Sequence, residues 1–553
     1  MNKTRKYLTI KQKRYVIAIV VGIMTLIYSL FFIYNQTQKQ YIQGNILNLP
    51  FIKLENTNNP RFYSPFKNQS IASMFVYRSL FSYDYTLENN IQPDLADSFK
   101  IYDDGLIYTI VLNENNYWSD GVLITAEDVL FTIKAVLKDS VEYSSDSEYM
   151  YSVVLNYIKG AEDYKDNLSD EIEGITINDN IITIELTHKY NTFLPVISQL
   201  VILPYHILKD EDLNTLSEND FWLNPVVSGM YMFSEEVNVK KPNIEEHYFR
   251  LVPNEYYTGK KSSIEEVRLH LEHEDKKLDY YITSNVSEMI NYGNSLDYAK
   301  YNLDMLLYTF FVFNISSDDG NYNQQMDNVK VRQAIISALD REKILSTVYL
   351  GVGEIINSGV VNHNPANNSF EHEYDPDKSI QLLEEANYDF SRPFVIAYQH
   401  EDYQTMHLLS SVSSYLEKVG LKVELLNTST EKEMYFDKNY DMILQDYSAF
   451  NENAWYSKYD KANIYHINLF SLDNDFEGLF SQLRESKTPE ERTNTLKLLQ
   501  NLEQEKLYIL PMYSLNKVTF INTTRVNLPD NIKLGNSSYR YDIKVEDWSI
   551  NRN

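Results

Sequence analysis

The sequence predicts a mixed α/β protein with more than one lobe, preceded by a single membrane-spanning helix. Three observations support this prediction. The chain has 553 residues, which is more than one hydrophobic core usually holds. Stretches with strand periodicity alternate with stretches of helix periodicity, most clearly between residues 310 and 450. Near the start, residues 15–34 form an uncharged apolar run.

This apolar run, from Tyr15 to Tyr34, has the length of a transmembrane helix, because a helix of about 30 Å matches the hydrocarbon core of a bilayer. Residues 1–14 contain basic residues and no acidic one, so the positive-inside rule places them in the cytoplasm and the body outside. A cleaved signal peptide is the alternative, but the polar NQTQKQ follows where a small-residue cleavage site would lie. We therefore expect an uncleaved anchor in the cell membrane, followed by an extracytoplasmic tether at 35–50.

Charge and composition exclude several classes of protein. The formal net charge of −28 repels phosphate backbones, so nucleic-acid binding is not expected. The absence of cysteine excludes disulfides, thiolate zinc sites, cysteine nucleophiles and a lipidated cysteine as the tether.

Alternation along the expected strand places His270 and His273 on opposite faces, so we expect no metal site there. No GxSxG, Walker, HExxH or GxGxxG motif occurs in a suitable context, and we expect neither an enzyme nor a cofactor.

Local patterns locate individual strands and helices. Alternating residues predict strands at 108–112 and 181–186. Thr125 and Asp375 are expected to cap helices, and Gly420 to end one. Helical periodicity predicts helices at 125–138, 329–349, 376–387, 404–419 and 488–506.

Several short motifs follow one another in an order that resembles the oligopeptide/dipeptide-binding family of ABC-transporter solute-binding proteins. The resemblance covers the body from about residue 60 to about residue 520. Its motifs are Pro93-Asp94-Leu95-Ala96-Asp97-Ser98, Asp104-Gly105, Trp118-Ser119-Asp120-Gly121, Thr125-Ala126-Glu127-Asp128-Val129, Ser228-Gly229-Met230-Tyr231, Asn254-Glu255-Tyr256-Tyr257, Val329-Lys330-Val331-Arg332-Gln333-Ala334, Asp340-Arg341-Glu342-Lys343, Tyr374-Asp375-Pro376 and Leu510-Pro511-Met512-Tyr513.

The resemblance implies a bilobal periplasmic-binding-protein-like fold with an extra subdomain, whose lobes close on a ligand about a hinge. We expect lobe I at 51–79, 200–307 and 509–553, a subdomain inserted in it at 80–199, and lobe II at 308–508. The implied function is the substrate-binding component of an ABC importer, with a peptide-like ligand, permease subunits as partners and a monomeric body. A membrane-anchored sensor of the same fold is the alternative, and a hydrolase is less favoured.

Most motif residues are interpreted as structural. Trp118 is expected in the core. Gly229 is expected to let the backbone turn near a crossover between lobes. Arg332 is expected to pair with Asp340 or a neighbouring carboxylate.

The expected ligand site follows Asp441. Residues 442–444 read as a short buried strand, followed by a polar-aromatic loop whose rings and carboxylates suit a cationic amine and an apolar side chain. The resemblance implies that this loop lines the cleft and carries a tryptophan, then an acidic residue that holds the peptide's amino terminus. Tyr447 falls at the tryptophan position, Glu452 is the carboxylate closest to the acidic position, and Asp446 is the alternative.

The family's Asp-Pro pair is absent from this loop, which puts the amino-terminal clamp in question. A second segment, beginning at Tyr63, resembles the family's first cleft segment. The expected ligand-binding residues are Tyr63, Ser64, Asp446, Tyr447, Phe450, Asn451, Glu452, Trp455 and Tyr456.

Overall fold

The computed structural model describes a large part of the chain beyond residue 43. The described residues are 44–51, 73–84, 90–103, 105–138, 154–190, 193–198, 200–241, 244–271, 278–283, 285–315, 323–362, 364–428, 430, 433–434, 439–449, 452–459, 475–529 and 545–551. The expected anchor at 15–34 lies outside them. Within these ranges no helix combines the length and the apolar character needed to cross a bilayer.

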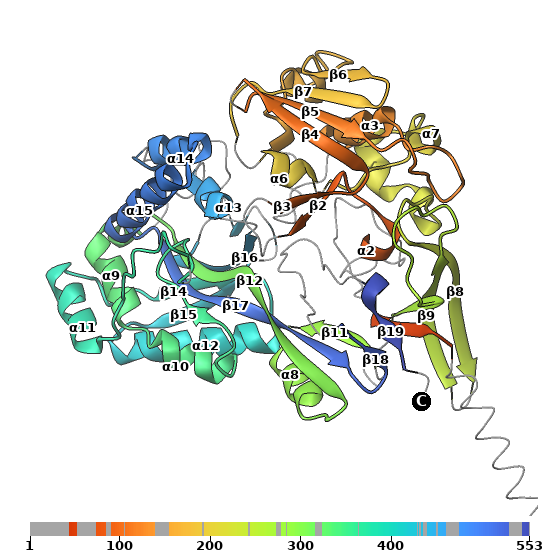
Figure 1. Ribbon diagram of the computed structural model, residues 1–553. Helices are drawn as coiled ribbons and strands as arrows, with labels where there is room; N and C mark the ends of the chain where they lie inside the picture. The colour runs from red at the N-terminus through yellow and green to blue at the C-terminus, as the bar shows by residue number, and fades with distance from the viewer. Residues whose placement is uncertain are drawn as a thin grey trace, which may run out of the picture.

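Lobe I is built on a four-stranded sheet in the order β1-β10-β9-β8 (Figure 1). β1 runs parallel to β10, and the other pairs are antiparallel. The strands are β1 (Ile46–Pro50), β10 (Glu266–His270), β9 (Ile244–Pro253) and β8 (Tyr231–Lys241).

The inserted subdomain has a second four-stranded sheet, in the order β4-β5-β7-β6, and helix α3. Its buried side chains join those of lobe I in one hydrophobic core, so the two are packed as one body. The elements are β4 (Ala96–Tyr102), β5 (Ile107–Leu112), β7 (Ile181–Glu185), β6 (Ile175–Asn178) and α3 (Ala126–Lys138).

Lobe II has its own hydrophobic core around a seven-stranded mixed sheet. Six strands follow the order β11-β17-β12-β16-β14-β15, and the seventh, β13, pairs with β17. The strands are β11 (Tyr280–Thr283), β17 (Ile509–Asn522), β12 (Tyr298–Phe313), β13 (Glu354–Ile355), β16 (Met442–Ala449), β14 (Phe394–Tyr398) and β15 (Val423–Asn427). The helices are α9 (Val329–Ser337), α10 (Arg341–Val348), α11 (Pro376–Glu385), α12 (Tyr403–Lys418), α13 (Glu452–Tyr456), α14 (Asp475–Glu485) and α15 (Pro489–Lys506).

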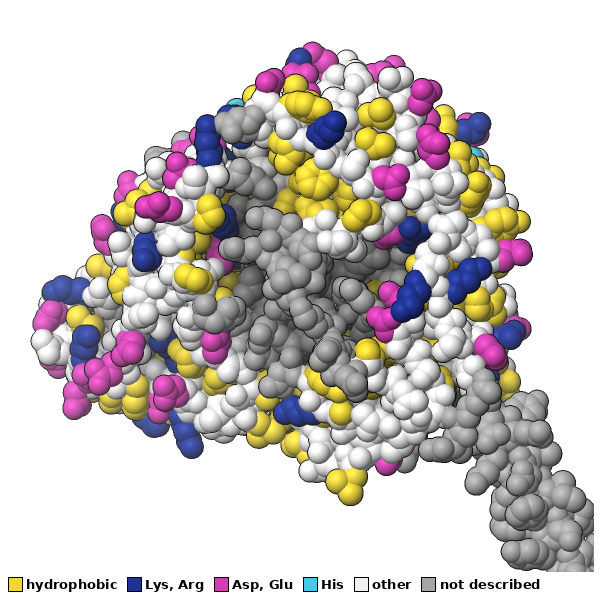
Figure 2. All heavy atoms as spheres, in the orientation of Figure 1, with side chains coloured by type: hydrophobic (Ala, Val, Ile, Leu, Met, Phe, Trp, Pro, Cys, Tyr) yellow, Lys and Arg dark blue, Asp and Glu magenta, His cyan; other side chains and the backbone are white. Residues whose placement is uncertain are grey.

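The described fold also contains short 3-10 helices and several shorter helices and strands. The shorter helices and strands are α2 (Ser73–Val76), β2 (Phe81–Asp84), β3 (Asn90–Pro93), α5 (Ala161–Lys165), α6 (Phe193–Ser198), α7 (Tyr205–Leu208), α8 (Val286–Gly293), β18 (Val526–Asn527) and β19 (Ser549–Ile550). The acidic side chains do not gather in one patch on the face in Figure 2, where they are scattered over both lobes.

Three of the expected domain boundaries differ from the structure. Residues 46–50 were assigned to the tether, but they form β1, because Leu47 and Leu49 are fully buried against β10. Residues 509–522 and 298–307 were assigned to lobe I, but β17 and β12 pair along their length in the sheet of lobe II. These long strands carry the chain between the bodies, so sheet pairing assigns them to lobe II.

The predicted strands and most predicted helices are present with shifts of one or two residues. Asp375 accepts a hydrogen bond from the Lys378 amide at the start of α11, as expected of a cap. The helix predicted at 329–349 is wrong in one respect, since the structure has two helices, α9 and α10. The carboxylate of Asp340 accepts from the Lys343 amide and starts the second helix.

The three structural motif residues have different outcomes. Trp118 is fully buried in the core, as predicted. Gly229 lies in a bend at 229–230, and it also permits a close backbone approach, because an added Cβ would lie 2.4 Å from the carbonyl oxygen of Phe75. Arg332 does not pair with Asp340; its guanidinium donates to backbone carbonyls at the end of α15, including that of Leu507.

Candidate functional site

The parallel strands of lobe II bring polar residues to one edge of its sheet. β14 runs parallel to both β15 and β16, so the carboxyl ends of the three strands meet. This is the edge at which open α/β sheets generally bind ligands. His400 and Asp402 follow β14, and Asp446 lies on β16 beyond its pairing with β14. This edge of the sheet is therefore the candidate ligand-binding site.

Asp446 is a carboxylate at this edge that has no ion-pair partner in the described part of the chain. It lies opposite Thr309 of β12, whose hydroxyl donates to the carboxylate. Among the residues that the structure describes, no lysine or arginine forms an ion pair with Asp446. A carboxylate in this state can accept a cationic group from a ligand.

The carboxyl group of Asp446 is accessible to solvent and is also partly desolvated by the protein around it. Its side chain is exposed. Desolvation by the surrounding protein nevertheless raises the pKa of the carboxyl, and this exceeds the lowering effect of the Thr309 hydroxyl. An amine that bound at this carboxylate would meet a negative charge that solvent screens less than at an open surface.

Glu452, the carboxylate closest to the family's acidic position, is already neutralised. Its Oε2 accepts from Nη2 of Arg492 at 2.9 Å, and Oε1 accepts from the side-chain amide of Asn364. Only 12% of the Glu452 side chain is exposed. A ligand amine would have to displace Arg492 and leave its guanidinium partly buried without this partner, which is costly.

The polar-aromatic loop expected from Asp446 onward is not a loop. β16 continues through Ala449 because its residues pair with β12 from Leu306 to Phe313. α13 then begins at Glu452. The expected strand at 442–444 is confirmed as the first part of β16, with side chains that are at most 7% exposed. Phe450, Asn451, Tyr63 and Ser64 lie outside the described residues.

The expected aromatic ligand contacts lie in the core of lobe II. Trp455 and Tyr456 are fully buried, and Tyr447 is 6% exposed. The indole Nε1 of Trp455 donates to Glu503 at 2.6 Å, and the Tyr456 hydroxyl donates to it at 2.8 Å. The ammonium of Lys458 lies 3.1 Å from the centroid of the Tyr447 ring. The polar groups of Trp455 and Tyr456 therefore bind Glu503, within lobe II.

Glu503 links these aromatic residues to the rest of lobe II. It also accepts from the amide of Gly359, where an added Cβ would lie 1.9 Å from the Trp455 ring. Burial raises the pKa of Glu503 to about 7, and this exceeds the lowering effect of its hydrogen-bond donors and of Lys458. No sequence pattern predicts this role for a glutamate within α15.

The buried carboxyl of Glu503 predicts a pH dependence of stability. Because its pKa rises on folding from 4.5 to about 7, the folded state holds a proton that the unfolded state releases between these pH values. Its contribution is complete below about pH 4.5 and is lost as the pH rises to about 7. We expect this to remove about 3 kcal/mol from the unfolding free energy. Urea titrations at pH 5 and pH 7 measure how much unfolding free energy is lost between these two pH values. The loss should be smaller in Glu503→Gln than in wild type, and an equal loss in the two proteins would contradict the prediction.

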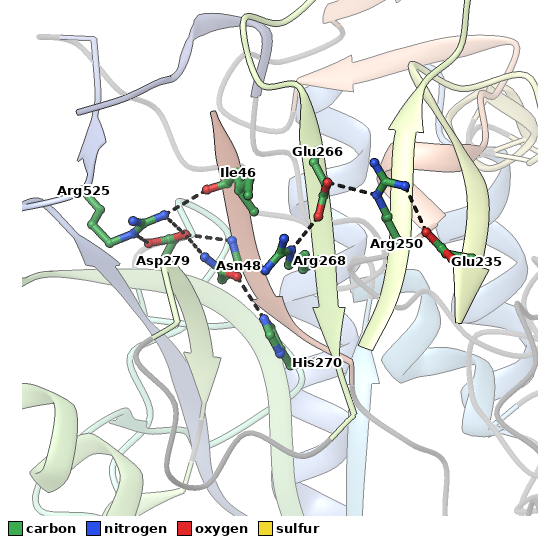
Figure 3. A network of polar contacts seen from close by, with 9 residues as sticks. All are labelled: Ile46, Asn48, Glu235, Arg250, Glu266, Arg268, His270, Asp279 and Arg525. Carbon is green, nitrogen blue, oxygen red and sulfur yellow. Dashed lines mark hydrogen bonds and ion pairs between the residues drawn. The ribbon is translucent and has the colours of Figure 1, made fainter. Parts of the chain in front are cut away.

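A polar network joins the two bodies where the chain crosses between them (Figure 3). Asp279, just before β11, is fully buried and accepts from Nε of Arg525 at 2.7 Å. It also accepts from the backbone amide of Asn48 in β1 at 2.7 Å and from its side-chain amide at 3.0 Å. Arg525 lies between β17 and β18, so Asp279 and Arg525 sit on the two crossing segments. Sequence inspection did not identify either residue, because 246 positions separate them.

The same network continues over the sheet of lobe I and becomes exposed at its far end. His270 is hydrogen-bonded to Asn48 through Nε2 at 3.0 Å, which leaves it in a structural role. Glu266 lies between Arg268 and Arg250, and Arg250 also binds Glu235 at 3.0 Å. Within the part of the chain that the structure describes, no group of His, Asp or Glu side chains could hold a metal ion.

Comparisons with known proteins agree with this architecture. The family model described as bacterial extracellular solute-binding proteins, family 5 (Middle), matches residues 90–460. The oligopeptide-binding protein AppA of Bacillus subtilis is 25% identical over 350 residues, which are 60% of this chain and 58% of that protein. Heme-binding protein A of Haemophilus influenzae is 26% identical over 332 residues, 57% of each chain. The chain spans about three fifths of the length of the curated relatives it matches.

Solved structures show the same fold with different ligands. Lactococcal OppA, complexed with an endogenous peptide in the closed conformation, has a TM-score of 0.69 at 18% identity and covers 91% of this chain and 99% of its own. NikA of Brucella suis, in complex with Fe(III)-EDTA, has a TM-score of 0.70 at 18% identity and covers 92% and 100%. The fold alone therefore does not select the ligand.

Proposed function

Because the chain belongs to the bacterial extracellular solute-binding proteins of family 5, we propose that it is the substrate-binding component of an ABC importer. It captures a peptide-like ligand between lobe I and lobe II and delivers it to permease subunits. The observation that carries the ligand proposal is Asp446, an exposed carboxylate that has no ion-pair partner among the described residues and lies at the edge where open α/β sheets generally bind ligands. The peptide named with OppA and the oligopeptide in the name of AppA support this ligand class.

Asp446 is the group that we assign to the ligand's amine. It replaces Glu452 in this role, because Arg492 already neutralises Glu452. An ammonium group bound at Asp446 would gain a charge-assisted hydrogen bond in an enclosed space. The backbone groups of an extended ligand would need partners elsewhere in the cleft.

The proposal includes attachment to the membrane. The apolar segment at 15–34 would hold the body on the extracytoplasmic side, where a solute arrives before it reaches the permease. A stationary binding protein of this kind would act close to its permease, since the tether is short.

Ligand capture is tested by purifying the full chain from alkaline-washed membranes and recording its native mass spectrum in detergent. We expect the chain to stay in the washed membranes and to carry bound masses that denaturation releases unchanged as short peptides. The lobes should remain bound to these peptides because they enclose them. Recovery of the body in the culture medium with a new N-terminus near residue 40 would contradict the anchor. Release of cleaved products would indicate a hydrolase, and non-peptide masses would contradict the ligand class.

A further inference from the structure

One contact joins lobe II to the inserted subdomain away from the crossing segments. Arg484 of α14 donates through Nη1 to the hydroxyl of Tyr157, which lies between α3 and α5 of the subdomain. The guanidinium carbon also lies 5.8 Å from the centroid of the Tyr157 ring. The pair therefore combines a charge-assisted hydrogen bond with a cation–π contact.

Each side of this contact is held in place by its own body. The ring of Tyr157 stacks on Tyr190 with centroids 4.9 Å apart and an interplanar angle of 18°. Its backbone carbonyl accepts from the Thr187 amide at 2.8 Å. On lobe II the guanidinium of Arg484 lies 4.8 Å from the ring centroid of Phe480, which is buried one turn earlier in α14. Because both groups are ordered before they meet, the contact costs little conformational entropy.

The position of the contact makes it sensitive to movement of the lobes. In Figure 1, α14 lies at the end of lobe II nearest the inserted subdomain, while β11 and β18 lie at the opposite end. The Asp279–Arg525 pair marks the crossing segments at that opposite end. A rotation about the crossing segments displaces atoms in proportion to their distance from the axis. A small opening therefore separates Arg484 from Tyr157 before it disturbs Asp279.

We propose that the Arg484–Tyr157 contact, made between α14 and the inserted subdomain, is a latch that stabilises the closed arrangement of the lobes without ligand. The latch rests on the proposed closure of the lobes on a ligand, but it does not depend on which ligand is bound. A protein whose closed state is more populated binds its ligand more tightly, in proportion to that population. The latch thus sets how much of the ligand's binding energy is used for closure.

The test measures the distance between the lobes in the ligand-free full chain. The chain has no cysteine, so Glu162→Cys and Gln482→Cys, both at exposed positions, provide two unique sites for spin labels. Double electron–electron resonance in detergent then gives the ratio of closed to open molecules. We expect Arg484→Gln to lower this ratio three- to tenfold. Tyr157→Phe, which keeps the ring, should lower it less, and the double variant should resemble Arg484→Gln because one contact is removed.

Two further variants keep the outcome decisive. Glu235→Gln removes only the exposed ion pair with Arg250 on lobe I and should leave the ratio unchanged. Arg484→Lys keeps the charge and should fall between wild type and Arg484→Gln. An unchanged ratio in both Arg484→Gln and Tyr157→Phe, with melting temperatures equal to wild type, would overturn the latch. The ratio is measured without ligand, so it tests the latch independently of ligand binding. If the ratio shifts as expected but the protein binds no peptide, the latch is supported and only the proposed function is contradicted.

Discussion

Asp446→Asn is expected to weaken the binding of short peptides with a free amino end by roughly 30-fold to several thousand-fold. This corresponds to about 2–5 kcal/mol, the usual cost of removing one partner of an enclosed charge pair. The asparagine keeps the size of the side chain and can still accept from Thr309, so the local structure should change little. The substitution removes the attraction between the Asp446 carboxylate and the ammonium group of the peptide. Isothermal titration calorimetry with a library of tri- to pentapeptides measures the change.

The matched control is Glu452→Gln in the same lobe. Its affinity should equal that of wild type, because the Glu452 carboxylate already binds Arg492. Acetylated peptides should bind wild type about as weakly as free peptides bind Asp446→Asn. If Asp446→Asn binds as well as wild type while Glu452→Gln does not, the amine is held at Glu452 and Arg492 moves away on binding. If neither substitution changes the affinity, no amine clamp exists at either carboxylate.

Asp279→Ala is expected to lower the free energy of unfolding by about 3–5 kcal/mol. The fully buried carboxylate of Asp279 holds the guanidinium of Arg525 and two N–H groups of Asn48. Removing it leaves a partly buried charge and buried donors without their partner, which costs more than the ion pair contributes. The substitution also loosens both crossing segments. Urea titration followed by tryptophan fluorescence measures the loss.

Glu235→Ala is the control, because it removes an ion pair from the other end of the same network (Figure 3). The side chains of Arg250 and Glu235 are 36% and 56% exposed, so water screens their charges and the expected loss is below about 1 kcal/mol. A loss in Asp279→Ala no larger than that in Glu235→Ala would show that the crossing network contributes little. Asp279→Ala combined with Arg525→Ala should recover part of the stability, because the unpaired charge is then absent.

The sequence by itself determined the features whose causes lie close together along the chain. Asp375 caps α11 by reaching the amide of Lys378, three positions on, and Gly420 follows α12 in the left-handed conformation that favours glycine. Alternating residues showed the strands β5 and β7. The break between α9 and α10 also has a local cause, the N-cap at Asp340. The helical periodicity continues across this break, so it predicted a single helix. The order of the motifs gave the two-lobed fold.

Only the tertiary structure decided which polar groups remain available to a ligand. Trp455 and Tyr456 follow the expected site strand, but Glu503, 48 and 47 positions away, takes their donors. Glu452 meets Arg492 across 40 positions, which leaves Asp446 as the available one of the two carboxylates expected at the site. Arg484 meets Tyr157 across 327 positions. Residue type and spacing fix the neighbours within a few turns, whereas the partner of a charge is set by the packing of elements far apart in the chain.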